Sequence, residues 1–278
     1  MAPSGVPPAS RLNLGDAIHE GWTAFCRAPW SFVLFALLLT GLQILLQPLQ
    51  DHILRGARGE AIGPADWLVF LLGLTASLAA SCWGNVGLVR GAWQALEGQR
   101  PSFGELLRWD GPGFRRVLKA WIALASVLTI PLLAVTLVLA LAAAVLWLLE
   151  RTGFQLSDSS LLLPGVLLAV LVALLLGLML LASLYFGVNQ QFLAQVALLE
   201  RRGPLASVQR GRALIDPHWI MLLLLLLIKV TLMVLGLLTF TVGLLVAWPV
   251  VNCITTAAYR QLTRIEAEAE RLNPAPPY

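Results

Sequence analysis

Lys229 is the residue of this chain whose position most strongly suggests chemistry. It lies inside an apolar run that begins at Trp219, and ten residues of helix place it about 15 Å from the start of that run. A charge at such a depth in hydrocarbon is costly, so ionisable residues there commonly serve a substrate, an ion or a proton path. The partner expected for Lys229 is an acid, yet no Asp or Glu occurs in any long apolar run of the chain.

Structural roles for Lys229 compete with this functional one. The side chain can extend to the membrane surface, can be neutral, or can bond to polar groups made available elsewhere in the spans. Candidate partners are the hydroxyl groups of Ser183 and Tyr185, and backbone carbonyls freed near the helix-distorting residues Pro131, Gly177 and Gly236. The absence of Asp, Glu and His from the runs argues against a proton relay, and leaves a small transporter or channel as the functional hypothesis for Lys229.

Three glutamines form a polar stripe near the end of the first apolar run. Gln43, Gln47 and Gln50 follow one another at i, i+4 and i+7, which places them on one face of a helix. The stripe either lines a polar cavity that opens to the outside or bonds to a neighbouring helix. Under the transporter hypothesis, it joins Lys229 along the path.

A second stripe consists of small and polar residues in the second apolar run. Gly73, Ser77, Ser81 and Asn85 recur at every fourth position. Small residues at this spacing let another membrane helix approach closely, and hydroxyl and amide groups hydrogen-bond across such contacts. The spacing therefore predicts a helix-packing surface.

Clusters of basic residues flank the apolar runs and are candidates for binding anionic lipid headgroups. A Lys or Arg near a charged leaflet contributes about 1 kcal/mol to such binding. The alternative is that these cations only set the orientation of the chain in the membrane. The candidates are Arg115, Arg116, Lys119, Arg201, Arg202, Arg210 and Arg212.

Enzyme chemistry is not indicated by any motif. There is no Ser/His/Asp set, paired carboxylates, HExxH or glycine-rich phosphate loop, and the three cysteines are far apart with no CxxC. The histidines, His19, His52 and His218, fall on two sides of the predicted membrane. The sequence therefore predicts a non-enzymatic protein with no cofactor or metal. Nucleic-acid binding is not expected either, because the cations are separated by hydrocarbon.

The composition shows which elements must position these residues. Of the 278 residues, 58% are apolar and 12% are charged, and the mean hydropathy is +0.80. A soluble domain is about one quarter charged, so this chain has too little polar surface to cover a water-soluble globule. The composition predicts an all-α, polytopic membrane protein.

Apolar runs of the length needed to cross a bilayer, about 20 residues, predict six membrane spans. They lie at about 30–49, 67–89, 117–149, 161–187, 219–238 and 243–259. The last two come from one run, 219–259, which as a single helix would be about 60 Å long, so a turn is expected between Gly236 and Gly243. One membrane domain, 14–265, is predicted between a disordered tail at 1–13 and a short tail at 266–278.

The distribution of Lys and Arg predicts the orientation. With six spans, fifteen of the nineteen cations fall on the side of the termini, three fall on the opposite side, and Lys229 is inside a span. Both termini are therefore expected in the cytoplasm, and the protein is expected in the cell inner membrane.

A short amphipathic stretch precedes each outward span. Before the first span, Leu14, Ile18, Trp22 and Phe25 share one face of a helix, and similar stretches begin near Phe103 and Leu205. Such helices lie in the headgroup layer. The pattern suggests three copies of one unit (interfacial helix, span, turn, span) packed as a compact bundle, although any three membrane hairpins with interfacial flanks would look alike.

The chain resembles a loose group of bacterial inner-membrane proteins. Three segments carry the resemblance: FLAQVALLERRGPLASVQRGRALIDPHWIMLLLLLLI, GLLVAWPVVNCITTAAYRQL and PSFGELLRW. They are similar to the membrane domain of some glycerophosphodiester phosphodiesterases and to uncharacterised YciC-like families. The shared positions are Gly203, Pro204, Trp219, Gly243, Pro249 and Tyr259. The chain has no separate barrel domain for a phosphodiesterase. The resemblance therefore implies an integral membrane helper of mostly unknown role. Together with the basic clusters, the sequence favours a protein that organises or assists other membrane proteins or lipids, by protein contact or by lipid contact at its cytoplasmic side.

Overall fold

Helices make up the regular structure of the described part of the chain. The computed structural model describes residues 12–51, 63–151, 158–239 and 242–272, and these contain no strand. Most of the predicted N-terminal tail, part of the predicted C-terminal tail and the segments 52–62, 152–157 and 240–241 lie outside the described residues. The α-helices are α1 (Leu14–Arg27), α2 (Pro29–Gln50), α4 (Pro64–Leu96), α5 (Phe103–Leu107), α6 (Gly111–Arg151), α7 (Asp158–Asn189), α8 (Leu193–Leu199), α9 (Pro204–Ile215), α10 (Trp219–Leu238) and α11 (Leu244–Leu272).

Four helical segments of the described chain are long and apolar enough to cross a membrane. They are Pro29–Gln50, Pro64–Leu96, Val170–Leu199 and Pro204–Leu238. The predicted span 117–149 falls within α6, and the predicted span 243–259 begins one residue before α11. Six crossings stay a prediction. In α11, polar residues from Asn252 onward lower the hydropathy, and the helix continues beyond the expected end at 259 to Leu272.

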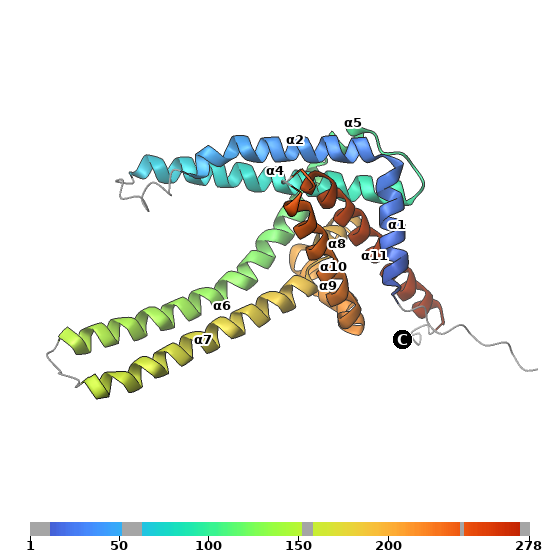
Figure 1. The fold of residues 1–278 in the computed structure, drawn as a ribbon. Coiled ribbons are helices and arrows are strands. Elements are labelled where there is room, and N and C mark those ends of the chain that lie inside the picture. The colour runs from blue at the N-terminus through green and yellow to red at the C-terminus, as the bar shows by residue number, and fades with distance from the viewer. Residues whose placement is uncertain (1–11, 52–62, 152–157, 240–241, 273–278) are drawn as a thin grey trace, which may run out of the picture.

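Local sequence signals determine where the first helices begin and end. The Asn13 carboxamide oxygen accepts hydrogen bonds from the backbone N–H groups of Gly15 and Asp16, at 3.0 and 3.4 Å, and so caps α1. Pro29 occupies the first turn of α2, where its missing N–H costs nothing. α1 therefore stops at Arg27, and the chain turns sharply into α2 (Figure 1).

The short helices and the adjoining ends of the long helices meet in one buried core, here called the hub. Its side chains come from segments far apart in the sequence and are almost completely excluded from solvent. They include Phe25, Phe32, Leu88, Leu106, Phe192, Ile215, Leu222 and Tyr259. Burial of a large apolar side chain stabilises a fold by about 1.5–3 kcal/mol, so the hub joins the three helical hairpins to one another.

α11 is the central helix of the hub, and it contacts α1, α2, α4 and α10. Arg260 of α11 donates to the Leu96 carbonyl at 2.7 Å and to the Glu20 carboxylate of α1 at 2.7 Å. Arg27 of α1 donates to the Ala95 carbonyl. Two cations thus satisfy carbonyls at the C-terminal end of α4, where the helix dipole also favours positive charge.

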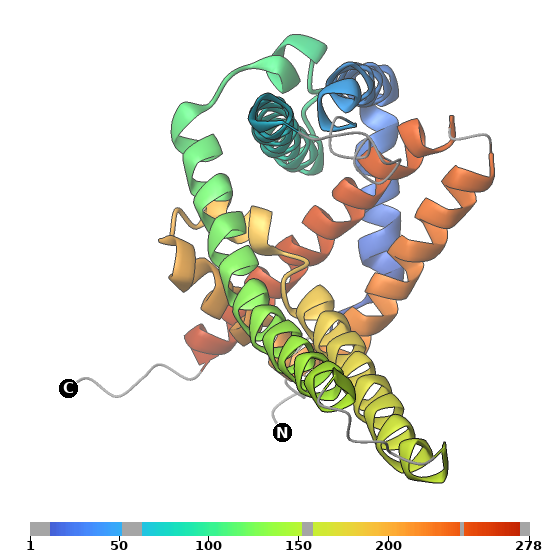
Figure 2. The ribbon, with the colours of Figure 1, turned by 90° about the vertical axis from the view of Figure 1, so that its left-hand side faces the viewer.

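The long helices form three hairpins, each preceded by a short helix. The pairs are α2–α4 after α1, α6–α7 after α5, and α10–α11 after α9. The expected compact bundle is wrong, because the α2–α4 and α6–α7 hairpins diverge from the hub (Figure 1 and Figure 2). Away from the hub their large apolar side chains have few protein partners. Leu174 and Leu181 of α7, for example, are 65% exposed.

The short helix α8 was not expected from the sequence. This helix follows the end of α7, and most of its residues are buried, including Leu193, Gln195 and Val196. It packs against α6, α9 and α4. Its seven residues are too few for a periodic pattern to separate them from the apolar run before them.

Candidate functional site

A cleft of about 860 Å³ lies beside the hub, lined by residues of α4, α6, α8, α10, α11 and the loop after α7. Its size falls within the range of small-molecule sites, about 300–1,000 Å³. Most of its lining is apolar. The polar residues of the lining are Asn85, Gln190, Gln191, Gln195, Lys229, Asn252 and Thr255.

Lys229 is the charged residue among those that line the cleft in the described structure. Side chains on a helix lean toward its N-terminus, so the ammonium of Lys229 is directed toward the first turns of α10. There its Nζ donates to the Oε1 of Gln191 at 3.5 Å. The Nε2 of Gln191 in turn donates to the Leu222 carbonyl at 3.3 Å, which orients the amide oxygen toward the lysine.

The other amides of the cleft have spare hydrogen-bonding capacity. Gln190 donates to the Val208 carbonyl at 3.4 Å and Gln195 to the Thr256 hydroxyl at 3.5 Å. The Oε1 atoms of both glutamines are buried without a hydrogen-bond donor. Both oxygens are shielded from the open space of the cleft, so they offer no contact to a molecule that enters it.

Polarity changes along the cleft. Asn85, Gln195 and Thr255 lie on helix segments next to the hub, whereas Leu128 of α6 and Leu237 of α10 lie farther out along their helices. The lining residues of α10 run from Leu226 to Leu237, a length of about 16 Å in a helix. The cleft is thus polar at the hub and apolar away from it.

The glutamine stripe does not belong to the cleft. The Nε2 of Gln43 donates to the Ser77 carbonyl at 3.1 Å and to the Ser81 hydroxyl at 2.9 Å, and the Ser77 hydroxyl donates back to the Gln43 amide oxygen. Gln47 is exposed and Gln50 is half-buried. The structure therefore brings Gln43 together with two members of the small-residue stripe, and it separates Gln43 from Lys229.

The remaining members of that stripe lie in two places. Gly73 packs so closely on α2 that a Cβ there would lie 2.6 Å from the Cβ of Leu49. Asn85 lines the cleft, and its amide donates to the Ser81 carbonyl of its own helix at 3.2 Å. The stripe thus faces α2 in the outer part of α4 and the cleft near the hub.

Replacing Gln43 by Leu is expected to lower the free energy of unfolding by about 1–2 kcal/mol, because three hydrogen bonds between α2 and α4 are lost. The matched change is Gln47→Leu at the exposed position of the same stripe, which is expected to be close to neutral. Thermal unfolding in mild detergent measures both. Equal midpoints for the two variants would show that Gln43 does not hold this hairpin together.

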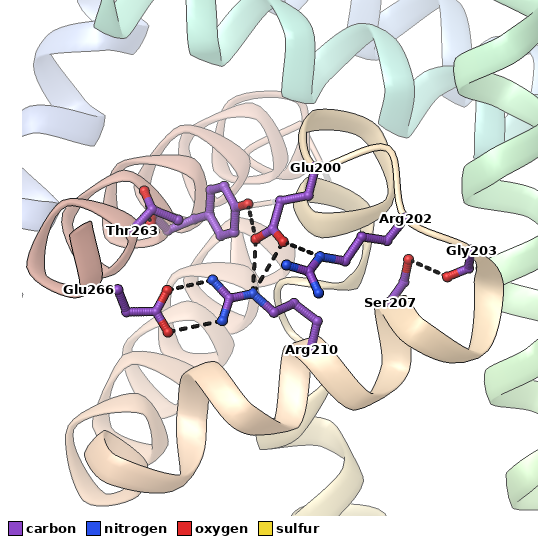
Figure 3. A network of polar contacts seen from close by, with 8 residues as sticks. Glu200, Arg202, Gly203, Ser207, Arg210, Thr263 and Glu266 are labelled. Atoms are coloured by element: carbon purple, nitrogen blue, oxygen red, sulfur yellow. Dashed lines mark hydrogen bonds and ion pairs between the residues drawn. The ribbon is translucent and has the colours of Figure 1, made fainter. Parts of the chain in front are cut away.

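The seven basic candidates differ in their surroundings. The Arg210 guanidinium bonds to Glu266 through both terminal nitrogens, and its Nε lies 3.1 Å from the Glu200 carboxylate (Figure 3). Arg202 also pairs with Glu200, at 2.6 Å, and Arg212 lies 3.6 Å from Asp216. The charges of these three arginines are thus already matched by carboxylates.

Four of the candidates have no ion pair with any described residue: Arg115, Arg116, Lys119 and Arg201. The first three lie at the start of α6, which packs against α8 and α9, and Arg201 lies between α8 and α9. We call these four residues the basic face. Arg115, Lys119 and Arg201 are exposed.

Sequence reasoning missed Gln190, Gln191 and Gln195 as members of the Lys229 site. A signal for them existed, because the segment VNQQFLAQ places polar side chains directly after a long apolar run.

The described residues contain no group of three or more His, Cys, Asp or Glu that could hold a metal ion. No protein-family model matches the chain, and no curated protein or solved structure matches it either.

Proposed function

We propose that the chain is a six-span, non-enzymatic protein of the cell inner membrane that organises or assists membrane lipids and other membrane proteins. Both termini lie in the cytoplasm in this proposal, and the short helices α1, α5 and α9 lie at the cytoplasmic surface. The resemblance noted in the sequence implies an integral membrane helper, which is compatible with this role. Neither a cofactor nor a nucleic acid takes part.

The observation that carries the proposal is the contrast between the hub and the hairpins. The hub is buried and connected by ion pairs, whereas the outer parts of the hairpins expose long apolar surfaces. No residue is buried in the most apolar window of the segment Val170–Leu199. Contiguous apolar surfaces of this kind are contact sites for a membrane or for other proteins.

Anionic lipid is the partner that fits the basic face. Its cations lie where α6 leaves the hub, and no carboxylate of the described residues pairs with them. Lys and Arg near an anionic leaflet each contribute about 1 kcal/mol to lipid binding. Such contacts would hold the hub at the membrane surface and gather anionic lipid around the α6–α7 hairpin.

Reversing the charges of Arg115 and Arg116 to Glu is expected to reduce co-purified anionic lipid by about ten-fold or more, because two attractive contacts become repulsive. The measurement is native mass spectrometry of the protein purified in mild detergent. The control variant, Arg264→Glu with Arg271→Glu, changes the net charge equally at exposed positions of α11 and is expected to retain more lipid. Unchanged lipid content in the Arg115/Arg116 variant would refute lipid binding at the basic face.

A small transporter or channel is the second candidate, and the position of Lys229 in the cleft favours it. The sequence-based version of this hypothesis combines Lys229 with Gln43, Gln47 and Gln50. Gln43 is instead engaged by α4 and does not line the cleft, so the path would depend on Lys229 alone. Loss of a measured flux in a folded Lys229→Met variant would favour transport, and an unchanged or absent flux would favour the organising role.

A further inference from the structure

Lys229 brings a positive charge into a cleft whose described lining contains no acidic residue. Its hydrogen-bond partner, Gln191, is a neutral amide. We infer that the cleft binds one anionic membrane lipid, with the headgroup next to Lys229 and an acyl chain along the walls formed by α6, α10 and α11. This inference rests on the proposed membrane function and names a specific ligand site within it.

The electrostatics of Lys229 favour an anion at the polar end of the cleft. A lysine ammonium has three donor hydrogens, and Gln191 accepts one of them at the long distance of 3.5 Å. In surroundings of low polarity, an uncompensated charge costs several kcal/mol unless a counter-charge is near. A phosphate oxygen of a lipid supplies that charge and accepts the remaining hydrogens.

The net charge of the headgroup distinguishes the candidate lipids. A phosphatidylglycerol headgroup carries an unbalanced phosphate charge, whereas a choline headgroup balances its phosphate charge with its own cation. The described lining of the cleft brings no acid to Lys229, so the unbalanced phosphate is the better counter-charge. The site therefore favours phosphatidylglycerol over phosphatidylcholine.

The walls indicate a lipid rather than a free anion. Leu128, Met233, Leu237 and Trp248 continue the cleft beyond Lys229 with apolar surface, which a small hydrated anion would leave uncovered. An acyl chain lying along this surface removes it from water and gains about 0.8 kcal/mol for each buried methylene. The headgroup chemistry alone would also fit inorganic phosphate, so the test must separate the two.

The charge of the site argues against a helix of a partner protein as the occupant. A membrane helix would have to bring an acid into hydrocarbon to pair with Lys229, which is costly. An anionic lipid instead carries its phosphate next to its own acyl chains, and so matches both the lysine and the apolar walls of the cleft.

The test compares lipid binding by the full chain in mild detergent, using phosphatidylglycerol and phosphatidylcholine with identical acyl chains and native mass spectrometry as the readout. The wild-type protein is expected to retain one phosphatidylglycerol in preference to phosphatidylcholine. Lys229→Met is expected to weaken phosphatidylglycerol binding by about ten-fold or more, the loss typical of a charged hydrogen bond, without changing phosphatidylcholine binding. Lys229→Arg, which keeps the charge, is expected to retain the preference.

A second variant keeps the inference testable if Lys229→Met fails to fold. Ala125→Phe places a large side chain in the wall of the cleft and leaves Lys229 unchanged, so it is expected to exclude the retained lipid by bulk. Inorganic phosphate in excess is expected not to displace the lipid. Displacement by phosphate, an undiminished preference in folded Lys229→Met, or co-purification of a membrane protein that depends on Lys229 would each overturn the inference.

The Arg115→Glu/Arg116→Glu variant separates this inference from the proposed function. It is expected to lose lipid bound at the basic face but to keep the one lipid that depends on Lys229. If charge reversal releases lipid and Lys229→Met has no effect, the cleft inference fails while the proposed function stands. If Lys229→Met releases one lipid and charge reversal has no effect, lipid binding at the basic face fails and the cleft inference stands.

Discussion

Replacing Arg210 by Met is expected to lower the free energy of unfolding by about 2–3 kcal/mol. Arg210 of α9 bonds to Glu266 of α11 through both terminal nitrogens, and its Nε lies within 3.2 Å of both Glu200 oxygens (Figure 3). Breaking a fully buried ion pair costs about 3–5 kcal/mol. The expected loss is smaller here because the side chains of Arg210 and Glu266 are 22% and 41% exposed.

Arg210→Met is expected to lower the free energy of unfolding strongly because Arg210 lies between two carboxylates and pairs with both. Without it, Glu200 keeps Arg202 and the Tyr259 hydroxyl, which donates to it at 2.9 Å, whereas Glu266 loses its ion-pair partner. Among the described residues, Arg210–Glu266 is the ion pair that joins α9 to α11, and the variant removes it. The variant is therefore expected to loosen the packing of α9 before the rest of the hub unfolds.

Arg212→Met is the matched control, because it removes the same charge from the same helix. The contact of Arg212 with Asp216 is 3.6 Å long between side chains that are 64% and 53% exposed, and exposed pairs contribute at most about 1 kcal/mol. Thermal unfolding in mild detergent compares the variants. If Arg210→Met and Arg212→Met lower the midpoint equally, the network does not connect α9 to α11.

Replacing Gly21 by Ala is the second change with a large expected effect, a loss of about 1–3 kcal/mol. A Cβ at Gly21 would lie 2.5 Å from the Cα and 2.6 Å from the backbone nitrogen of Ile254. Backbone atoms inside a helix cannot move aside as a flexible side chain can. The added methyl group is therefore expected to push α1 away from α11.

Gly41→Ala is the control for Gly21→Ala. Gly41 is also inside a helix, but a Cβ there meets nothing within 4 Å, so the higher helix propensity of Ala should stabilise α2 by up to about 1 kcal/mol. Unfolding midpoints and the rate of proteolysis within α1 distinguish the two. Stabilisation by both substitutions would contradict the close contact between α1 and α11.

Features determined by local sequence were predictable. The apolar runs expected to span at 30–49 and 219–238 correspond to helices Pro29–Gln50 and Trp219–Leu238. Run length, flanking prolines and tryptophans are local properties, and helical hydrogen bonds form within each segment. The turn expected between Gly236 and Gly243 likewise falls where one helix ends at Leu238 and the next begins at Leu244.

Features that depend on distant contacts were not predictable in the same way. The partner of Lys229 is Gln191, 38 positions away, and no periodicity relates the two. Arg210 looked like a surface cation because both of its carboxylate partners lie outside its own helix. Trp22 was assigned to the apolar face of the first short helix, yet it is 50% exposed because the smaller Gly21 makes the close contact with α11.

The divergence of the hairpins shows another limit of sequence reasoning. Apolar side chains predict that a surface avoids water, but the same pattern fits contact with lipid and contact with another helix. Leu174 and Leu181 therefore carried no information on whether α6 and α7 would join a compact bundle. The geometry of the hub determines the directions in which the hairpins leave it.

The central claim is that three hairpins cross the membrane from a hub on the cytoplasmic side. The most direct test is a fusion at the C-terminus, made separately with a reporter that works only in the cytoplasm and with one that works only outside it. The account predicts activity of the cytoplasmic reporter alone, and activity of the external reporter in a fusion placed after Thr239, at the end of α10. Activity of the external reporter at the C-terminus would contradict the account.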